Sequence, residues 1–489
     1  MRAHFLAVDL GAESGRAMLG GLQRGVLSLE EVCRFPNEPV RQHRSLQWDV
    51  LRLWLEIRRG LERASGHPIE SVGIDTWGCD YALLGERGDL LENPYHYRDL
   101  RTDGVMAEVW QRVSRERIYA ITGIQFLTFN TLYQLYAACR ATPKLIDAAT
   151  RFATVPDLLN YWMTGELAAE YTMATTTQFV AAKTRSWATG LLEELDIPTR
   201  LLPALVEPGS IVGHVRTDVC AALAGTPVVV PACHDTGSAV ASVFAGGKTA
   251  FLSSGTWSLL GTELGAPVMT PRACELNFTN EGGVCGTTRL LKNIGGLWLL
   301  QACRRSWAAA GHDFDYETLL AGAADERQAF RSLIDPDSPG FFQPEDMVAA
   351  IGQYCGQTGQ PVPASPAAFA RAILESLAFK YRVVLQSLEE LTGTRFDEIR
   401  IVGGGSRNSL LNQFTADATG RTVVAGPVEA TALGNIAMQM VATGAVASLA
   451  EARTIIGRSF PVTRFEPASP EVWDTHYARF LEYVEMTCV

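Results

Sequence analysis

The segment that decides the fold is Phe5-Leu6-Ala7-Val8-Asp9-Leu10-Gly11-Ala12-Glu13-Ser14-Gly15-Arg16-Ala17-Met18-Leu19. Its two apolar runs predict two β-strands, 5–8 and 16–19, joined by a polar, glycine-rich turn. The same plan returns in 249–260, where Ser253-Ser254-Gly255-Thr256 separates the strands 249–252 and 257–260. The two segments share their layout rather than their residues. We therefore expect two domains that each begin with one such hairpin.

The rest of the chain alternates short strand patterns with long helical patterns, which predicts an α/β fold. Residues from about 100 to 200 are rich in helical patterns. We place the domain boundary near Ala245-Gly246-Gly247, which gives domains of 1–246 and 247–489. The expected strands are 71–74, 226–233, 398–402 and 421–425, and the expected helices are 48–64, 367–391, 409–419 and 429–443.

Composition excludes several classes of protein. The 489 residues contain 42 Lys and Arg against 53 Asp and Glu, a net charge of −11, which argues against a nucleic-acid binder or a protein of anionic membrane surfaces. No apolar run approaches the roughly 20 residues of a membrane span. Asp9 interrupts the first apolar run too early for a signal peptide. The ten cysteines form no C-x-x-C pair, which favours buried thiols in a reducing cytoplasm.

The first hairpin can bind a polyphosphate. Glycines let the backbone approach an anion, turn N–H groups point at it, and Arg16 adds positive charge. Asp9 ends the first strand and can hold a hydrated Mg²⁺ ion. Taken alone, an ordinary hairpin with glycine in its turn explains the segment equally well. The chain contains neither G-x-x-x-x-G-K-[ST] nor G-x-G-x-x-G, so neither phosphate motif applies.

Two further segments have the composition of ligand turns. The second hairpin offers Ser253, Ser254 and Thr256, which can contact the same phosphate from the other side, although such residues are common in turns. Gly403-Gly404-Gly405 lies between a predicted strand and helix, where glycines permit close approach of a flat ligand or a phosphate. The alternative is a flexible turn between the strand and the helix. Each glycine costs backbone entropy on folding, so a turn alone does not readily explain three consecutive glycines.

The segment Cys233-His234-Asp235-Thr236-Gly237 ends an apolar run and can carry a catalytic base. A carboxylate placed there can accept a proton from an alcohol that attacks phosphorus. Asp235 can equally be a helix N-cap, and His234 can bind substrate or be a structural neighbour.

Two other segments resemble sugar sites in their chemistry. The segment 75–80, Asp-Thr-Trp-Gly-Cys-Asp, combines carboxylates, a hydroxyl and an indole, although Trp77 can also cover a core edge. In the segment 292–301, Asn293 and Gln301 are plausible ligand groups, whereas Trp298, Leu299 and Leu300 are more typical of a helix core.

Together these segments resemble the FGGY family of carbohydrate kinases, in the actin–hexokinase ATPase superfamily. The most distinctive stretches occur in order along nearly the whole chain: 73–78 (Gly-Ile-Asp-Thr-Trp-Gly), 97–99, 123–126, 130–135, 174–178, 253–258, 279–283 (Thr-Asn-Glu-Gly-Gly), 291–294 (Leu-Lys-Asn-Ile) and 426–430. The resemblance implies two ribonuclease-H-like, actin-like domains that flank a central cleft, with the sugar against the N-terminal domain and ATP mostly against the C-terminal domain.

The resemblance also implies roles for individual residues. The general base would be Asp235, and Asp9 would hold Mg²⁺ through water, with ATP as co-substrate. The ATP site would contain Ala12, Glu13, Ser14, Gly15, Arg16, Thr256, Gln301 and Gly404. The sugar site would contain Gly78, His234, Asp235, Thr236 and Asn293. Glu13 places an acid inside the phosphate loop, so its side chain must point away from the anion or be balanced by Arg16.

The activity implied is transfer of the ATP γ-phosphoryl group to O1 of L-rhamnulose, which gives L-rhamnulose 1-phosphate and ADP. The alternatives are a kinase for another ketose (L-fuculose, L-xylulose or ribulose), an actin-like non-metabolic ATPase, and a sugar sensor without catalysis. Neither nucleic acid, nor membrane, nor an obligate protein partner is expected. Some relatives carry paired cysteines where this chain has Thr415 and Thr419, so no disulfide is expected there.

Overall fold

The computed structural model describes residues 3–244, 246–325 and 329–486 and divides the chain into two compact units. The first unit consists of Met1–Phe244, Glu263–Leu290 and Glu429–Pro461, and the second of Ala245–Thr262, Leu291–Val428 and Val462–Val489. These units group residues by contact and are discontinuous in sequence. The expected division into 1–246 and 247–489 stays a prediction, and its boundary residue Ala245 lies outside the described residues.

The first unit is built on a six-stranded sheet in the order β13-β14-β6-β1-β2-β3. β1 pairs antiparallel with β2 and parallel with β6, which joins the predicted hairpin to the next predicted strand. The predicted strand 226–233 is shorter in the structure, because β14 ends two residues before Pro231, which has no N–H to donate to a ladder. The strands are β1 (Ala3–Leu10), β2 (Ser14–Gln23), β3 (Val26–Pro36), β6 (Ile69–Thr76), β13 (Ile211–His214) and β14 (Pro227–Val229).

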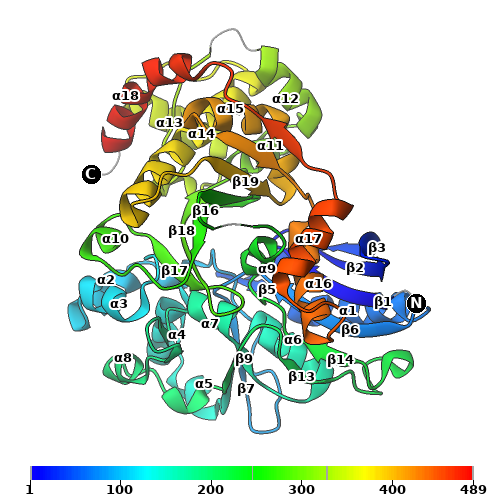
Figure 1. Ribbon diagram of the computed structural model, residues 1–489. Helices are drawn as coiled ribbons and strands as arrows, with labels where there is room; N and C mark the ends of the chain where they lie inside the picture. The colour runs from blue at the N-terminus through cyan, green and yellow to red at the C-terminus, as the bar shows by residue number, and fades with distance from the viewer. Residues whose placement is uncertain (1–2, 245, 326–328, 487–489) are drawn as a thin grey trace. The chain divides into compact units, whose positions relative to one another are not determined.

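Helices α1, α9, α16 and α17 cover this sheet (Figure 1). The predicted helix 48–64 is α1 (Val50–Ala64), whose buried Leu53, Ile57 and Leu61 recur at helical spacing. The apolar core on another part of the sheet joins Phe5 and Ala7 to Ile436 of α16. The other three helices are α9 (Asp235–Ala241), α16 (Ala430–Ala442) and α17 (Leu449–Ser459).

The helix-rich stretch predicted at about 100–200 also belongs to the first unit and contains seven α-helices with short strand pairs. Its helices are α2 (Val105–Arg112), α3 (Arg115–Thr122), α4 (Thr131–Ala141), α5 (Pro143–Ala148), α6 (Val155–Thr164), α7 (Tyr171–Thr176) and, after a short hairpin, α8 (Thr189–Glu194). The short strands of the unit are β4 (Pro39–Gln42), β5 (Ser45–Trp48), β7 (Tyr81–Leu84), β8 (Arg151–Thr154), β9 (Ala169–Glu170), β10 (Val180–Ala181), β11 (Ser186–Trp187), β12 (Leu205–Val206) and β17 (Thr279–Gly282), with helix α10 (Pro271–Glu275).

The second unit repeats the plan of the first, with strands in the order β18-β16-β15-β19-β20-β21. Read from β3, the first sheet has the order β3-β2-β1-β6-β14, and the second unit has the corresponding order β18-β16-β15-β19-β20. The repeated hairpins predicted this relationship. The elements are β15 (Thr249–Ser254), β16 (Trp257–Leu264), β18 (Thr288–Gly295), β19 (Glu398–Val402), β20 (Thr422–Ala425), β21 (Thr463–Phe465), α11 (Trp298–Ala309), α12 (Tyr316–Asp325), α13 (Met347–Gln357), α14 (Pro366–Thr392), α15 (Ser409–Thr419) and α18 (Pro470–Met486). In the described parts of the chain, no helix is both long and apolar enough for a membrane span.

Candidate active site

Asp9 and Arg16 face each other across the first hairpin. They are register partners of β1 and β2, and Arg16 donates from Nε (2.9 Å) and Nη2 (2.7 Å) to Oδ2 of Asp9. Arg16 Nη1 also pairs with Glu429, which lies just before α16. Arg16 is therefore held between two carboxylates at the end of β1.

The turn between these strands is shaped for close approach. An ideal Cβ on Gly15 would lie 2.6 Å from Cδ2 of Leu10 and would overlap the ring of Phe35, so no side chain fits there. Asn37 fixes the turn by donating from Nδ2 to the carbonyl of Gly11 over 2.8 Å. The Glu13 side chain is exposed. This small, fixed turn is suited to present backbone N–H groups to a phosphate.

Three chain segments end at the same edge of the first sheet. Asp9 of β1 is the register partner of Asp75 of β6, and Thr76 forms a parallel bridge with His234. Backbone bonds confirm the convergence, since Thr76 N–H donates to Cys233 O (2.8 Å) and Trp77 N–H to Leu10 O (3.2 Å). The carboxyl ends of parallel strands thereby bring Asp9, Asp75 and Asp235 into one acidic region.

Asp235 is the first residue of α9, and His234 is the N-cap. The alternative prediction that Asp235 is the helix N-cap is therefore wrong, because the N-cap is the preceding residue, His234. Oδ1 accepts from the Thr236 hydroxyl (3.1 Å) and backbone N–H, and lies 3.5 Å from His234 Nε2. Among the described residues, Oδ2 has no hydrogen bond. Burial raises the pKa of Asp235, His234 opposes that rise, and Asp9 adds to it. One oxygen is thus fixed and the other is available for a proton.

Gly78 and His234, both predicted to contact sugar, lie together in the first unit. An ideal Cβ on Gly78 would lie 3.4 Å from His234 Nε2 and 3.3 Å from Oγ1 of Thr176 in α7. Cys79, the next residue, has a φ of +74°, a conformation that non-glycine residues adopt mainly where surroundings enforce it. The loop is therefore held tightly against His234.

Asp80 is the residue that holds this loop. Its fully buried carboxylate accepts from Trp48 Nε1 (2.6 Å), Trp77 Nε1 (2.9 Å), Gln134 Nε2 (2.9 Å) and Tyr97 N–H (3.2 Å). Burial raises the pKa of Asp80 to about 6 despite these donors. Trp77 is 5% exposed, and its ring centroid lies 4.1 Å from that of Trp48 with the rings tilted by 37°, so its indole belongs to the core rather than to a sugar platform.

In the second unit, the second hairpin is joined to the start of α11. Leu297 N–H donates to Gly255 O (3.0 Å) and Trp298 N–H to Thr256 O (3.1 Å). Gly296 makes this possible, since an ideal Cβ there would lie 2.6 Å from the carbonyl carbon of Trp257. Gln301 follows in the first turn of α11, so Thr256 and Gln301 are fixed relative to each other.

The glycine loop lies against the same strand, β15. Gly403 has a φ of +84°, and an ideal Cβ there would lie 3.0 Å from Ser254 O. An ideal Cβ on Gly404 would meet nothing within 4 Å, so this residue faces open space. The second unit thus gathers Thr256, Gln301 and Gly404 around one end of β15, while Asn293 lies half-buried in β18.

The sequence analysis gave no position within the site to several other residues of the first unit. Asp75 and Glu281 lie in stretches that carried the resemblance, but only the fold places Asp75 beside Asp9 and Glu281 beside His234. Thr176 lies in the distinctive stretch 174–178, but only the fold places it against Gly78. Arg289 had no local signal, because its contact with His234 joins segments far apart in sequence.

The residues at Asp9 fit a divalent cation held mainly by other ligands. The described residues contain no cluster of three or more His, Cys, Asp or Glu that could hold a metal ion by themselves. Both bonds from Arg16 go to Oδ2 of Asp9. A single carboxylate is a common Mg²⁺ contact where water and substrate phosphates supply the remaining oxygens.

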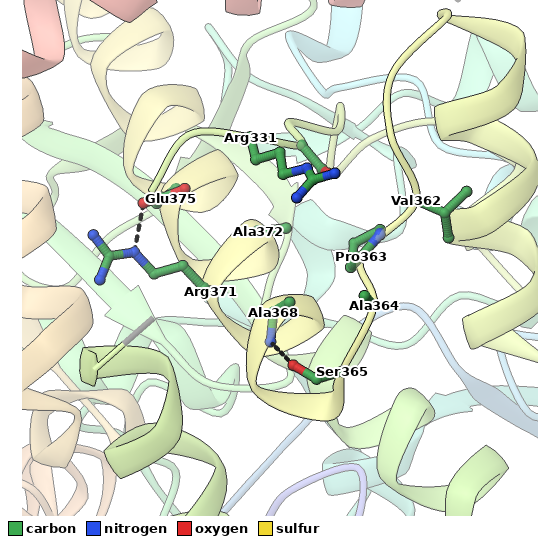
Figure 2. Close-up of a pocket in the computed structure, with 10 residues that line it drawn as sticks. Arg331, Val362, Pro363, Ala364, Ser365, Ala368, Arg371, Ala372 and Glu375 are labelled. Atoms are coloured by element: carbon green, nitrogen blue, oxygen red, sulfur yellow. Dashed lines mark hydrogen bonds and ion pairs between the residues drawn. The ribbon is translucent and has the colours of Figure 1, made fainter. Parts of the chain in front are cut away.

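A separate cavity of about 140 Å³ opens at the start of α14 and contains none of the predicted site residues (Figure 2). Ser365 caps the helix by accepting from Ala368 N–H (3.1 Å), and Arg371 Nε pairs with Glu375 at 2.5 Å. The charges on α14 beside this cavity are thus balanced internally, and we assign it no role in the reaction.

Comparison with known proteins gives the same family over both parts of the chain. Residues 4–242 match the N-terminal domain of the FGGY family of carbohydrate kinases, and residues 250–443 match its C-terminal domain. The chain is 45% identical over 485 residues to "Rhamnulokinase" of Bacteroides thetaiotaomicron, covering 98% of this chain and 99% of that protein. It is 42% identical over 469 residues to "Rhamnulokinase" of Oceanobacillus iheyensis, covering 95% and 99%.

Solved structures share the fold at low sequence identity. Gluconate kinase from Lactobacillus acidophilus superposes with a TM-score of 0.80 at 16% identity, covering 100% of this chain and 97% of that one. Plasmodium falciparum glycerol kinase with ADP gives 0.79 at 16% identity, covering 100% and 99%. The predicted two-domain α/β fold is confirmed. The chain belongs to the FGGY family of carbohydrate kinases.

Proposed function

We propose that this chain transfers the γ-phosphoryl group of ATP to O1 of L-rhamnulose, giving L-rhamnulose 1-phosphate and ADP. The observation that carries the proposal is Asp235, whose Oδ1 is fixed by Thr236 and lies 3.5 Å from His234 Nε2, while Oδ2 accepts no hydrogen bond from the described residues. The choice of sugar comes from the relatives that carry the name rhamnulokinase, which are 40–45% identical to this chain over nearly its whole length.

Asp235 accepts the proton of the attacking hydroxyl. Burial raises the pKa of Asp235, and a carboxylate with a raised pKa is a better base than an exposed aspartate. Gly78, His234, Thr236 and Asn293 bind the sugar hydroxyls. Because phosphoryl transfer depends mainly on positioning and charge stabilisation, the site needs no covalent intermediate on the protein.

The ATP contacts come from both hairpins. Ala12, Glu13, Ser14 and Gly15 offer backbone N–H groups to the phosphates, and Arg16 adds positive charge. Thr256 of the second hairpin contacts phosphate, and Gln301 and Gly404 contact the nucleotide. Asp9 would hold Mg²⁺ through water, and the ion would supply positive charge that neutralises the phosphates. In this assignment, 1–246 is the sugar side and 247–489 the nucleotide side.

The test is a ketose panel. Purified full-length protein is given ATP, Mg²⁺ and L-rhamnulose, L-fuculose, L-xylulose or L-ribulose at matched concentrations, and ADP release is followed by a coupled assay. We expect the highest kcat/KM for L-rhamnulose and little ADP release without sugar. A preference for another ketose would overturn the choice of sugar. ADP release that does not depend on any ketose would overturn the kinase assignment in favour of an ATPase.

A further inference from the structure

Arg289 is a fully buried charged residue that the reaction described above does not use. It lies in β18, and its side chain is 0% exposed. Its Nε donates to the carbonyl of Gly282 over 2.9 Å, and its Nη2 lies 3.2 Å from Oε2 of Glu281. A buried guanidinium is costly unless it is paired and hydrogen-bonded, so both contacts are required to keep it there.

The same guanidinium reaches the proposed sugar site. Arg289 Nη2 hydrogen-bonds His234 Nδ1 at 3.2 Å. A guanidinium nitrogen can only donate, so Nδ1 accepts in this bond; the competing arrangement is an Nδ1–H that donates to Glu281 Oε2, which also lies 3.2 Å away. The neutral imidazole then carries its proton on Nε2. Arg289 also packs beneath the first turn of α9, where an ideal Cβ on Gly237 would lie 3.5 Å from its Cζ.

The protonated nitrogen faces the groups that matter for phosphoryl transfer. His234 Nε2 lies 3.5 Å from Oδ1 of Asp235 and 3.4 Å from the ideal Cβ position of Gly78. A donor in this position can hold Oδ1 and keep Oδ2 directed at the sugar, or donate to a sugar hydroxyl over Gly78. An imidazole with its proton on Nδ1 would instead present a lone pair to the carboxylate.

We propose that Arg289 is a positioning residue that fixes the tautomer of His234, so that His234 Nε2–H serves Asp235 and the sugar. The inference deepens the proposed ketose kinase function and rests on it. Glu281 is the counter-charge: its Oε2 lies 3.2 Å from both Arg289 Nη2 and His234 Nδ1, so it offsets the arginine that would otherwise repel a protonated imidazole. The charged groups that face His234 are Glu281, Arg289 and Asp235.

The first test reads the tautomer directly. Full-length protein labelled with ¹⁵N-histidine is studied by NMR, and the His234→Gln variant identifies the His234 signals among the eight histidines. We expect the Nε2–H tautomer at neutral pH without ligands. An Nδ1–H tautomer, with Glu281 as its acceptor, would overturn the proposal. This readout does not depend on activity, so it decides the inference even if no ketose is phosphorylated, an outcome that would refute the proposed function alone.

The second test separates positioning from stability by a double-mutant cycle on ketose phosphorylation. Arg289→Lys keeps the charge and loses the planar fork, and we expect kcat/KM for the ketose to fall about ten-fold while KM for ATP stays within about two-fold. His234→Gln places an amide near Nε2 without an imidazole tautomer to fix. In that background, Arg289→Lys is expected to change kcat/KM by less than about two-fold. An equal ten-fold loss in both backgrounds would make Arg289 merely structural.

The control breaks a similar pair in the same unit. Arg453 and Glu263 are 12% and 9% exposed and pair at 2.7 Å. Glu263→Gln should lower the urea midpoint as Arg289→Lys does, yet leave kcat/KM for the ketose unchanged. An equal loss of kcat/KM in this control would overturn the proposal. If Arg289→Lys fails to fold, the tautomer of the wild-type protein remains the deciding measurement.

Discussion

The close packing of α16 on α9 makes Gly434→Ala an informative substitution. Gly434 lies in α16, and Figure 1 shows this helix beside α9, whose first residue is Asp235. An ideal Cβ on Gly434 would overlap the carbonyl oxygen of Ser238 and lie 2.6 Å from its carbonyl carbon. It would also lie 3.1 Å from Ser242 N, so backbone atoms at two points of the α9 segment must move.

The size of the effect follows from these distances. Carbon atoms pack at about 3.5 Å or more, so relief of the 2.6 Å contact requires a shift of roughly 1 Å. Overpacking of this kind costs about 1–3 kcal/mol of unfolding free energy. Because α9 has seven residues, the shift reaches Asp235. A misplacement of about 1 Å at a reacting group can cost about 10²-fold in rate.

The assay compares stability and activity in one set of proteins. Gly457→Ala in α17 is the control, because an ideal Cβ there meets nothing within 4 Å and alanine favours a helix by about 1 kcal/mol. Urea unfolding should show loss of stability for Gly434→Ala and none for Gly457→Ala. Coupled ADP release should show kcat reduced 10- to 100-fold, by the reasoning above, for Gly434→Ala alone. Wild-type kcat in a destabilised Gly434→Ala protein would refute the link from α16 to Asp235.

Three further outcomes are expected. Burial raises the pKa of Asp157 to about 7, so the folded state binds this proton more tightly than the unfolded chain does. The free energy of unfolding therefore falls by about 1.4 kcal/mol per pH unit as the pH rises from about 4 to 7. Asp157→Asn should remove that slope in urea titrations at several pH values, and an unchanged slope would assign it elsewhere. The Asp80 carboxylate accepts four hydrogen bonds, whereas the amide in Asp80→Asn also carries an NH₂ group that can only donate. The loop at Gly78 should then be held less well, so the KM for the ketose should rise at least several-fold while the KM for ATP stays constant. The acid limb of kcat/KM for the ketose should lie above pH 4, since only ionised Asp235 accepts a proton and its pKa is raised; a limb at or below pH 4 would contradict this.

The elements of the fold are readable from sequence because their signals are local. The hairpin at 5–19 is recognised by apolar runs around a glycine turn, and the structure extends it to Ala3–Leu10 and Ser14–Gln23. Helix 409–419 and strand 398–402 begin and end where the residue pattern does, at Asn408, the N-cap, and at the glycines that follow the strand. The predicted strand 226–233 is too long, because Val230 continues the apolar run beyond the end of β14 at Val229.

The site was only partly predictable because much of it depends on register. Asp75 lies beside Asp9 because β1 and β6 pair in one particular alignment, which no local pattern specifies. Trp77 was a candidate sugar platform by composition, but Asp80 and Trp48 turn its indole into the core. Arg289 reads as an ordinary charged residue of a strand, and only the fold buries it against His234.

The central claim, that Asp235 is the base of a ketose kinase, is tested most directly by single-turnover phosphorylation with Asp235→Asn. Wild-type and variant proteins are mixed with ATP, Mg²⁺ and L-rhamnulose, and the product is identified by ³¹P NMR while ATP binding is measured separately. We predict L-rhamnulose 1-phosphate from the wild type, unchanged ATP affinity in the variant, and a transfer rate lower by about 10² or more. A transfer rate close to that of the wild type in the variant would contradict the account.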